Sequence, residues 1–136
     1  MRRFRKIVVN GTEYRWLLRF DDYDYQYPPY LLVIKSACPR STLKIGFPVR
    51  EHYLLNEGLP AFYKGDSVFI NLNRPLVVSR IIAQCVKDGE AFEQEGYRYL
   101  NGVKILEEAG YEIDSIWTGN RKESETVETG QYGGEV

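Results

Sequence analysis

The dipeptide Asn10-Gly11 lies between two runs rich in β-branched and aromatic residues. Asn-Gly is a preferred pair for the two-residue type I′ turn, because both central residues of that turn need a positive φ angle. A two-residue turn also fixes the register of the strands it joins. We therefore predict an antiparallel hairpin in which Arg5 lies opposite Trp16, with its guanidinium group over the indole ring.

Alternating hydrophobic residues predict the strands that follow. In the second strand of the hairpin, one face would carry Tyr14, Trp16, Leu18 and Phe20. This alternation is typical of a half-buried antiparallel strand. We expect further strands at 31–34, 42–47, 52–55, 67–72 and 111–117, with turns at 38–41 and 57–60.

Two helices are predicted in the second half of the chain. Residues 76–87 carry apolar side chains at helical spacing behind Pro75, which is favoured in the first turn of a helix. We expect this helix to bury Val78, Ile82 and Cys85 and to leave Arg80, Gln84 and Lys87 in water. A second helix is predicted over 97–109, ending at Gly110.

These elements predict an α+β fold, with a mostly antiparallel sheet of five or six strands and two helices packed on one face. The length of 136 residues suits one domain, which we assign to residues 1–118. Residues 119–136 are rich in Glu, Thr and Gly, and they are expected to form a flexible acidic tail.

The overall charge and the cysteine pattern indicate which partners and which compartment to expect. The net charge of -1 provides no global field to attract nucleic acid or membrane, so such binding would need a local patch. Cys38 and Cys85 show no metal-ligand spacing and are expected to be free thiols. The start of the chain lacks the apolar stretch of a secretory signal, and no stretch is long enough to span a bilayer. A cytoplasmic protein with no membrane partner is the expectation.

The chemistry of a typical enzyme is hard to assemble from this sequence. The single histidine, His52, has no neighbouring metal-ligand or nucleophile motif, and no phosphate-binding or dinucleotide-binding glycine pattern occurs. We therefore expect no catalytic residues, no cofactor and no metal. A hydrolase that uses carboxylates such as Glu107 and Glu108 is an alternative, although solvated charge explains such pairs more simply.

A segment rich in tyrosine and aspartate follows the hairpin. Its candidate binding residues are Asp21, Asp22, Tyr23, Asp24, Tyr25, Tyr27 and Tyr30. Tyrosine is enriched at interfaces, and neighbouring carboxylates favour a basic partner. The leading functional hypothesis is therefore a non-enzymatic binding protein, an inhibitor or immunity-type protein that recognises a basic protein. The structural alternative is a connecting loop whose tyrosines pack back on the sheet.

A cluster of cations at the start of the chain supports a second hypothesis. Its members are Arg2, Arg3, Arg5 and Lys6, joined by Arg15 in the paired strand. With neighbouring aromatic rings, these cations could contact phosphates while the rings stack on bases. The alternative function is thus nucleic-acid binding through the basic hairpin. A third use of either surface is self-association into a homo-oligomer.

Two segments, 7–16 with its V-N-G-T-E-Y-R-W pattern and 73–82 with its Pro-initiated helix, resemble those of a group of small uncharacterised bacterial proteins. The resemblance covers about a quarter of the chain and fails after the helix, where Asp88-Gly89 replaces the Gly-Trp and Pro ending of the group. It implies a bacterial origin, and it supplies no activity and no site residue.

Overall fold

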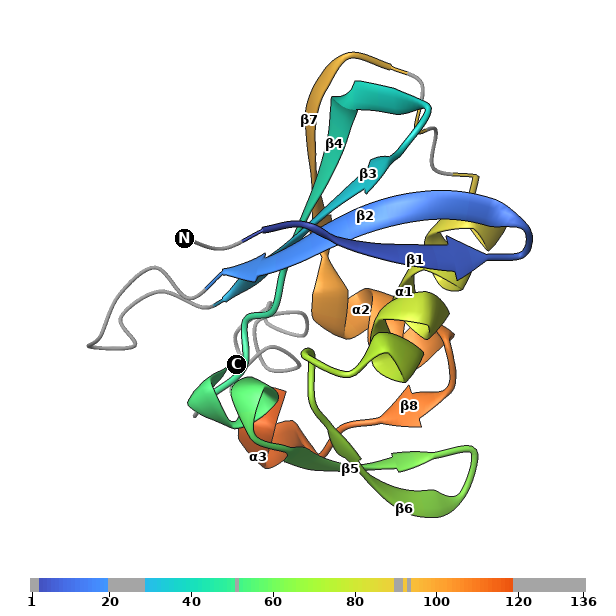
Figure 1. Cartoon of the computed structure of the whole chain (residues 1–136). Coiled ribbons are helices and arrows are strands. Elements are labelled where there is room, and N and C mark those ends of the chain that lie inside the picture. Colours follow the sequence, from blue (N-terminus) through green and yellow to red (C-terminus); the bar gives the residue numbers. More distant parts are fainter. Residues whose placement is uncertain (1–2, 20–28, 51, 90–91, 93, 119–136) are drawn as a thin grey trace, which may run out of the picture.

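The computed structural model describes residues 3–19, 29–50, 52–89, 92 and 94–118. In this part of the chain the fold is α+β, and its strands form two sheets (Figure 1). Sheet A has the strand order β1-β2-β3-β4-β7, and sheet B has the order β6-β5-β8. The strands are β1 (Arg5–Val9), β2 (Thr12–Arg19), β3 (Tyr30–Lys35), β4 (Cys38–Gly46), β5 (Leu59–Tyr63), β6 (Asp66–Ile70), β7 (Gly96–Asn101) and β8 (Tyr111–Glu112). The helices are the 3-10 helix η1 (His52–Asn56), α1 (Pro75–Lys87), α2 (Gly102–Glu108) and α3 (Ser115–Thr118).

The predicted hairpin is confirmed. Asn10 and Gly11 have φ angles of 51° and 81°, the positive values that a type I′ turn needs. β1 pairs with β2 in the expected register, with Arg5 opposite Trp16. The Arg5 guanidinium carbon lies 4.5 Å from the centre of the Trp16 ring system. Local turn chemistry is therefore enough to set this edge of sheet A.

Replacing Gly11 with valine should lower the free energy of unfolding by about 1 to 2 kcal/mol, because a β-branched residue strongly disfavours positive φ. Steric overlap contributes little, since a Cβ atom at Gly11 would have no neighbour within 4 Å. Chemical denaturation measures the change. Gly46→Val is the matched control, because Gly46 also has open space and lacks a positive φ. An equal loss in both variants would contradict the turn assignment.

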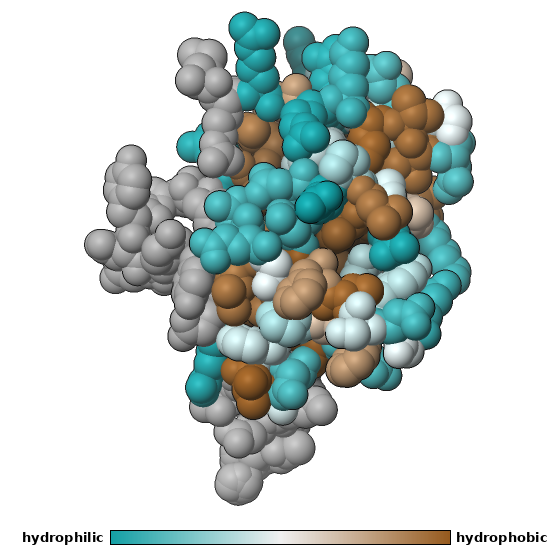
Figure 2. Space-filling model, turned by 60° about the horizontal axis from the view of Figure 1, so that its bottom comes forward, coloured by the Kyte–Doolittle hydropathy of each residue, from teal (hydrophilic) through white to brown (hydrophobic). Residues whose placement is uncertain are grey.

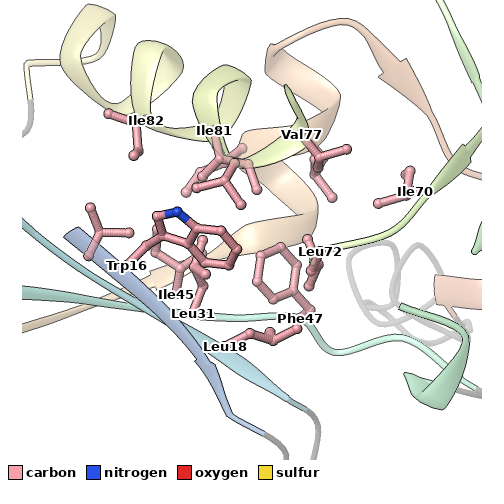
Figure 3. Packing of buried hydrophobic residues seen from close by; sticks show 14 of the residues in the cluster. Trp16, Leu18, Leu31, Ile45, Phe47, Ile70, Leu72, Val77, Ile81 and Ile82 are labelled. Atoms are coloured by element: carbon pink, nitrogen blue, oxygen red, sulfur yellow. The ribbon is translucent and has the colours of Figure 1, made fainter. Parts of the chain in front are cut away.

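The main core lies between the inner face of sheet A and α1. Trp16, on β2, is 2% exposed and packs beneath the helix residues Ile81 and Ile82 (Figure 3). The predicted face of α1 is confirmed for Val78, Ile82 and Cys85, all of them buried. Three side chains depart from the prediction. Val86 belongs to the apolar spacing of residues 76–87 but is 45% exposed. Arg80 and Gln84 are partly buried, Arg80 because its guanidinium group packs on aromatic rings.

The second predicted helix is wrong over its first half. Residues 96–101 form β7, which pairs in parallel with β4, and α2 covers only 102–108. The boundary lies at Asn101, whose side-chain oxygen accepts hydrogen bonds from the backbone N–H groups of Val103 and Lys104 at 2.9 and 3.3 Å. Asparagine at this position satisfies the free donors of a helix start, and so α2 begins here.

Three further predictions are corrected around sheet B. The predicted strand at 52–55 is η1, and the predicted turn at 57–60 runs into β5. The predicted strand at 111–117 is reduced to β8, because α3 begins after Asp114, whose side chain accepts a hydrogen bond from the Ile116 N–H at 3.0 Å. Sheet B is therefore a separate layer that the expectation of a single sheet missed.

The predicted turn at 38–41 is also shifted. The chain turns at 36–37, and Cys38 already begins β4. A register shift between Ile34 and Lys35 accommodates this early return. The consequence is a longer β4, which can pair with β3 on one side and with β7 on the other. Among the described residues, no helix is long and apolar enough to cross a membrane.

Candidate nucleic-acid interface

Within the described residues, one face of sheet A is covered by no helix. α1 and α2 lie on the other face, where Trp16 and its neighbours are buried (Figures 1 and 3). Successive side chains of a strand point to opposite faces, so the strand register determines which residues share the uncovered one. We call this the open face. Its side chains include Lys6, Val8, Glu13, Arg15, Leu17, Arg19, Tyr30, Leu32, Ile34, Thr42, Lys44, Tyr97 and Tyr99.

Three tyrosines and a lysine gather on the open face across β3, β4 and β7. Lys44 Nζ lies 4.2 Å from the centre of the Tyr30 ring and 5.5 Å from that of Tyr99. The Tyr97 and Tyr99 ring centres are 6.5 Å apart, and these side chains are 60% and 70% exposed. Tyr97 and Tyr99 are neighbouring rings at alternate positions of β7, and Lys44 on β4 lies beside Tyr99. Together they form a platform that can stack on flat π-systems and pair with an anion.

The other half of the open face carries positive charge. Lys6 on β1 lies directly opposite Arg15 on β2, and Arg19 follows on the same side of β2. Glu13 is the one carboxylate among the described strand positions of this face. Since the whole chain has a net charge of -1, this excess of cations is a local feature of sheet A.

Between the cations and the tyrosines, the open face is apolar. Leu17, Leu32 and Ile34 lie here on β2 and β3, and each is only partly buried. Side chains of this kind are usually covered when a helix packs on a sheet, and in the described part of the chain no helix covers them. The open face therefore presents apolar area flanked by cations on one side and aromatic rings on the other.

The predicted basic cluster is divided between the two faces of sheet A. Lys6 and Arg15 lie together on the open face. Arg5 points to the inner face, where it stacks on Trp16 and donates from Nη1 to the Asn73 carbonyl oxygen at 3.1 Å. Arg3 lines the same small recess of about 210 Å³ beside Trp16. Arg2 lies outside the described residues. The strand alternation explains why neighbouring cations separate in this way.

Most of the predicted Tyr/Asp loop is not covered by the structure. Tyr30 is described and opens β3, on the open face. The remaining candidates, Asp21, Asp22, Tyr23, Asp24, Tyr25 and Tyr27, lie outside the described residues. Their role in recognising a basic protein stays a prediction.

Sequence reasoning missed Lys44, Tyr97 and Tyr99 as site residues. The predicted helix over 97–109 contains both tyrosines, although the alternation in Gly96-Tyr97-Arg98-Tyr99-Leu100 also fits a strand. Asn101 was the available signal, because an asparagine before an apolar run favours a helix start there rather than at Tyr97. Nothing local in the sequence pairs Lys44 with either ring.

The carboxylates of the hydrolase alternative lie on α2. Glu108 lies near Asp88, and a side-chain hydrogen bond between them raises the pKa of Glu108 above its ordinary value, with desolvation and the Asp88 charge adding to the effect. Lys104 acts in the opposite direction. Glu107 and Glu108 are both exposed to solvent. In the described part of the chain, no three histidine, cysteine or acidic residues are grouped as metal ligands.

Comparisons with protein-family models, with curated proteins and with solved structures find no match for this chain. The resemblance to small bacterial proteins therefore stays a prediction.

Proposed function

We propose that this protein binds single-stranded nucleic acid on the open face of sheet A. The observation that carries the proposal is the cluster of Lys44 with Tyr30, Tyr97 and Tyr99, which places exposed rings and a cation together on an uncovered sheet. Exposed rings of this kind stack on unpaired bases, and each base stacked on an aromatic side chain contributes about 1 to 3 kcal/mol.

The charge on the open face supports an anionic strand as the ligand. Bases stacked on Tyr97 and Tyr99 would leave their phosphates directed along the sheet, towards the cations of β1 and β2. The five strands span roughly 19 Å at the usual inter-strand spacing, which is room for a short stretch of nucleotides. Lys6, Arg15 and Arg19 are the described cations that such a strand would reach.

A single strand fits better than a duplex. The flat faces of duplex bases are hidden in the stack, so tyrosine rings lying on a sheet have nothing to stack on. Duplex readers usually insert a helix or a two-stranded ribbon into a groove. The helices α1 and α2 lie on the opposite face of sheet A. The same cations would repel a basic protein partner from this face, so that hypothesis depends on the Tyr/Asp loop alone.

The test is a titration of labelled single-stranded oligonucleotides, DNA and RNA, followed by fluorescence anisotropy. Tyr97→Ala and Tyr99→Ala should each weaken binding about 5- to 150-fold, the loss of one stacked base. Lys6→Ala and Arg15→Ala should weaken binding and lower the slope of log affinity against log salt by about 1 each. A duplex of the same sequence should bind more weakly.

Phe69→Ala is the matched control, because Phe69 is an aromatic side chain of sheet B with the same 70% exposure as Tyr99. It should leave oligonucleotide binding unchanged. Equal affinity in the Tyr97, Tyr99 and wild-type proteins would refute the proposal. Binding of basic proteins that is lost in Asp22→Asn or Asp24→Asn would favour the Tyr/Asp loop hypothesis instead.

A further inference from the structure

A groove of about 520 Å³ separates β6 from the first turns of α1, on the side of the molecule that carries sheet B. Apolar residues are exposed among hydrophilic ones on the surface seen from this side (Figure 2). Phe69 on β6 and Leu76 on α1 both line the groove, and they are 70% and 60% exposed. Val68 and Val77 complete the apolar part of its lining. A groove with this much exposed apolar area is typical of a contact surface.

The groove follows the free edge of a β-strand. β6 is an outer strand of sheet B, and in the described part of the chain it pairs with β5 alone. The neighbouring residues Val68 and Phe69 both line the groove, although consecutive strand residues point to opposite faces. Tyr111 of β8 lines the groove as well, so the groove extends from the face of sheet B beneath α1 to the edge of β6. Asp66, at the start of β6, is its one charged residue, and residues 67–70 carry no charge, so most of this edge lacks the usual protection against pairing with another strand.

A guanidinium group is held in position at the floor of the groove. Arg80, on α1, lies 3.8 Å from the centre of the Tyr63 ring and donates from Nη1 to the Tyr111 hydroxyl at 2.8 Å. Tyr63 and Tyr111 themselves pack with ring centres 4.7 Å apart. These contacts fix the orientation of the side chain, and a guanidinium has five N–H donors, of which this hydrogen bond uses one.

The two arginines that line the groove favour a negatively charged ligand. Arg74 lines the groove beside Arg80, against the single carboxylate of Glu57. Arginine recognises carboxylates with paired, parallel hydrogen bonds, and a fixed guanidinium loses less entropy when it does so. We propose that this groove binds an extended acidic segment of a partner protein. Its backbone pairs with β6, an apolar side chain contacts Phe69 and Leu76, and a carboxylate reaches Arg80 and Arg74.

This proposal is independent of the open face, because it rests on sheet B and α1. The probe is a labelled peptide of alternating Glu and Val, with acetylated and amidated ends, titrated against the full chain and followed by fluorescence anisotropy. It should bind, and the version with Gln in place of every Glu should bind at least tenfold more weakly. A third version, N-methylated at alternate residues so that it cannot donate to β6, should lose binding to a similar extent.

Variants of the protein identify the groove. Arg74→Gln should weaken binding of the Glu/Val peptide about tenfold, and Arg80→Lys should do the same, since it keeps the charge but loses the planar donors. Lys87→Gln, an exposed cation at the other end of α1, is the matched control and should change nothing. These two groove variants should leave oligonucleotide binding unaffected, which separates this proposal from the proposed function.

Three results would overturn the proposal. Equal affinity for the Glu and Gln peptides would show that the groove does not recognise carboxylates. Full binding of the N-methylated peptide would show that the peptide does not pair with β6. A concentration-dependent dimer that Phe69→Glu abolishes, without peptide binding in the monomer, would assign the edge to a second copy of this chain.

Discussion

Ile82→Ala should lower the free energy of unfolding by about 2 to 5 kcal/mol, the usual cost of removing a large aliphatic side chain from a packed core. Ile82 lies on the side of α1 that packs against the Trp16 ring, and it has no exposed surface (Figure 3). The rigid indole and the strands of sheet A limit collapse around the cavity, which favours the upper part of this range. Denaturation in urea measures the loss as a shift of the midpoint at unchanged slope.

Val86→Ala is the control for this prediction, because Val86 lies one turn further along α1 and is 45% exposed. It should cost less than about 1 kcal/mol, since half of its surface is already in water. Similar losses in both variants would mean that the buried face of α1 is assigned incorrectly. A lower slope in Ile82→Ala would instead indicate a change in the compactness of one of the two states.

Gly102→Ala should cost about 1 to 3 kcal/mol through steric overlap. A Cβ atom at Gly102 would overlap the ring of Phe47, which is completely buried. Alanine normally stabilises a helix relative to glycine by about 1 kcal/mol, so the sign of the effect distinguishes packing from helix propensity. The same denaturation experiment gives that sign.

Gly46→Ala is the matched control. Gly46 lies at the end of β4, lacks a positive φ, and leaves nothing within 4 Å of an added Cβ atom. It should be neutral or slightly stabilising. In a Phe47→Leu background, Gly102→Ala should cost less than it does in the wild type, because the smaller side chain can give way. A stabilising Gly102→Ala would contradict the close approach of α2 to Phe47.

The two proposed surfaces both attract negative charge, and they differ in what else they need. The open face combines cations with exposed rings, so Tyr99→Ala should affect oligonucleotides and leave the acidic peptide unaffected. The groove combines a fixed guanidinium with a strand edge, so Arg80→Lys should have the opposite pattern. A variant that reduced both affinities equally would indicate loss of folding or a general charge effect.

The local elements of this protein follow from its sequence wherever one short segment contains the whole physical cause. The Asn10-Gly11 turn needs only its own positive φ angles, and the register of β1 and β2 follows from it. The burial of Val78, Ile82 and Cys85 on α1 follows from a 3.6-residue period read along the helix. In both cases, the information lies within a single segment.

Only the tertiary structure decided the parallel pairing of β4 with β7 and, with it, the open face. Residues 97–101 carry apolar groups at spacings that fit a strand or a helix, and the neighbouring strand β4 determines which forms. Lys44 meets Tyr99 because β4 and β7 pair although they lie far apart in the sequence, and Arg80 meets Tyr63 because α1 packs over sheet B. Such contacts depend on the packing of apolar surfaces that are far apart in the sequence. Because the hydrophobic effect is non-directional, it produces no residue spacing from which these contacts could be predicted.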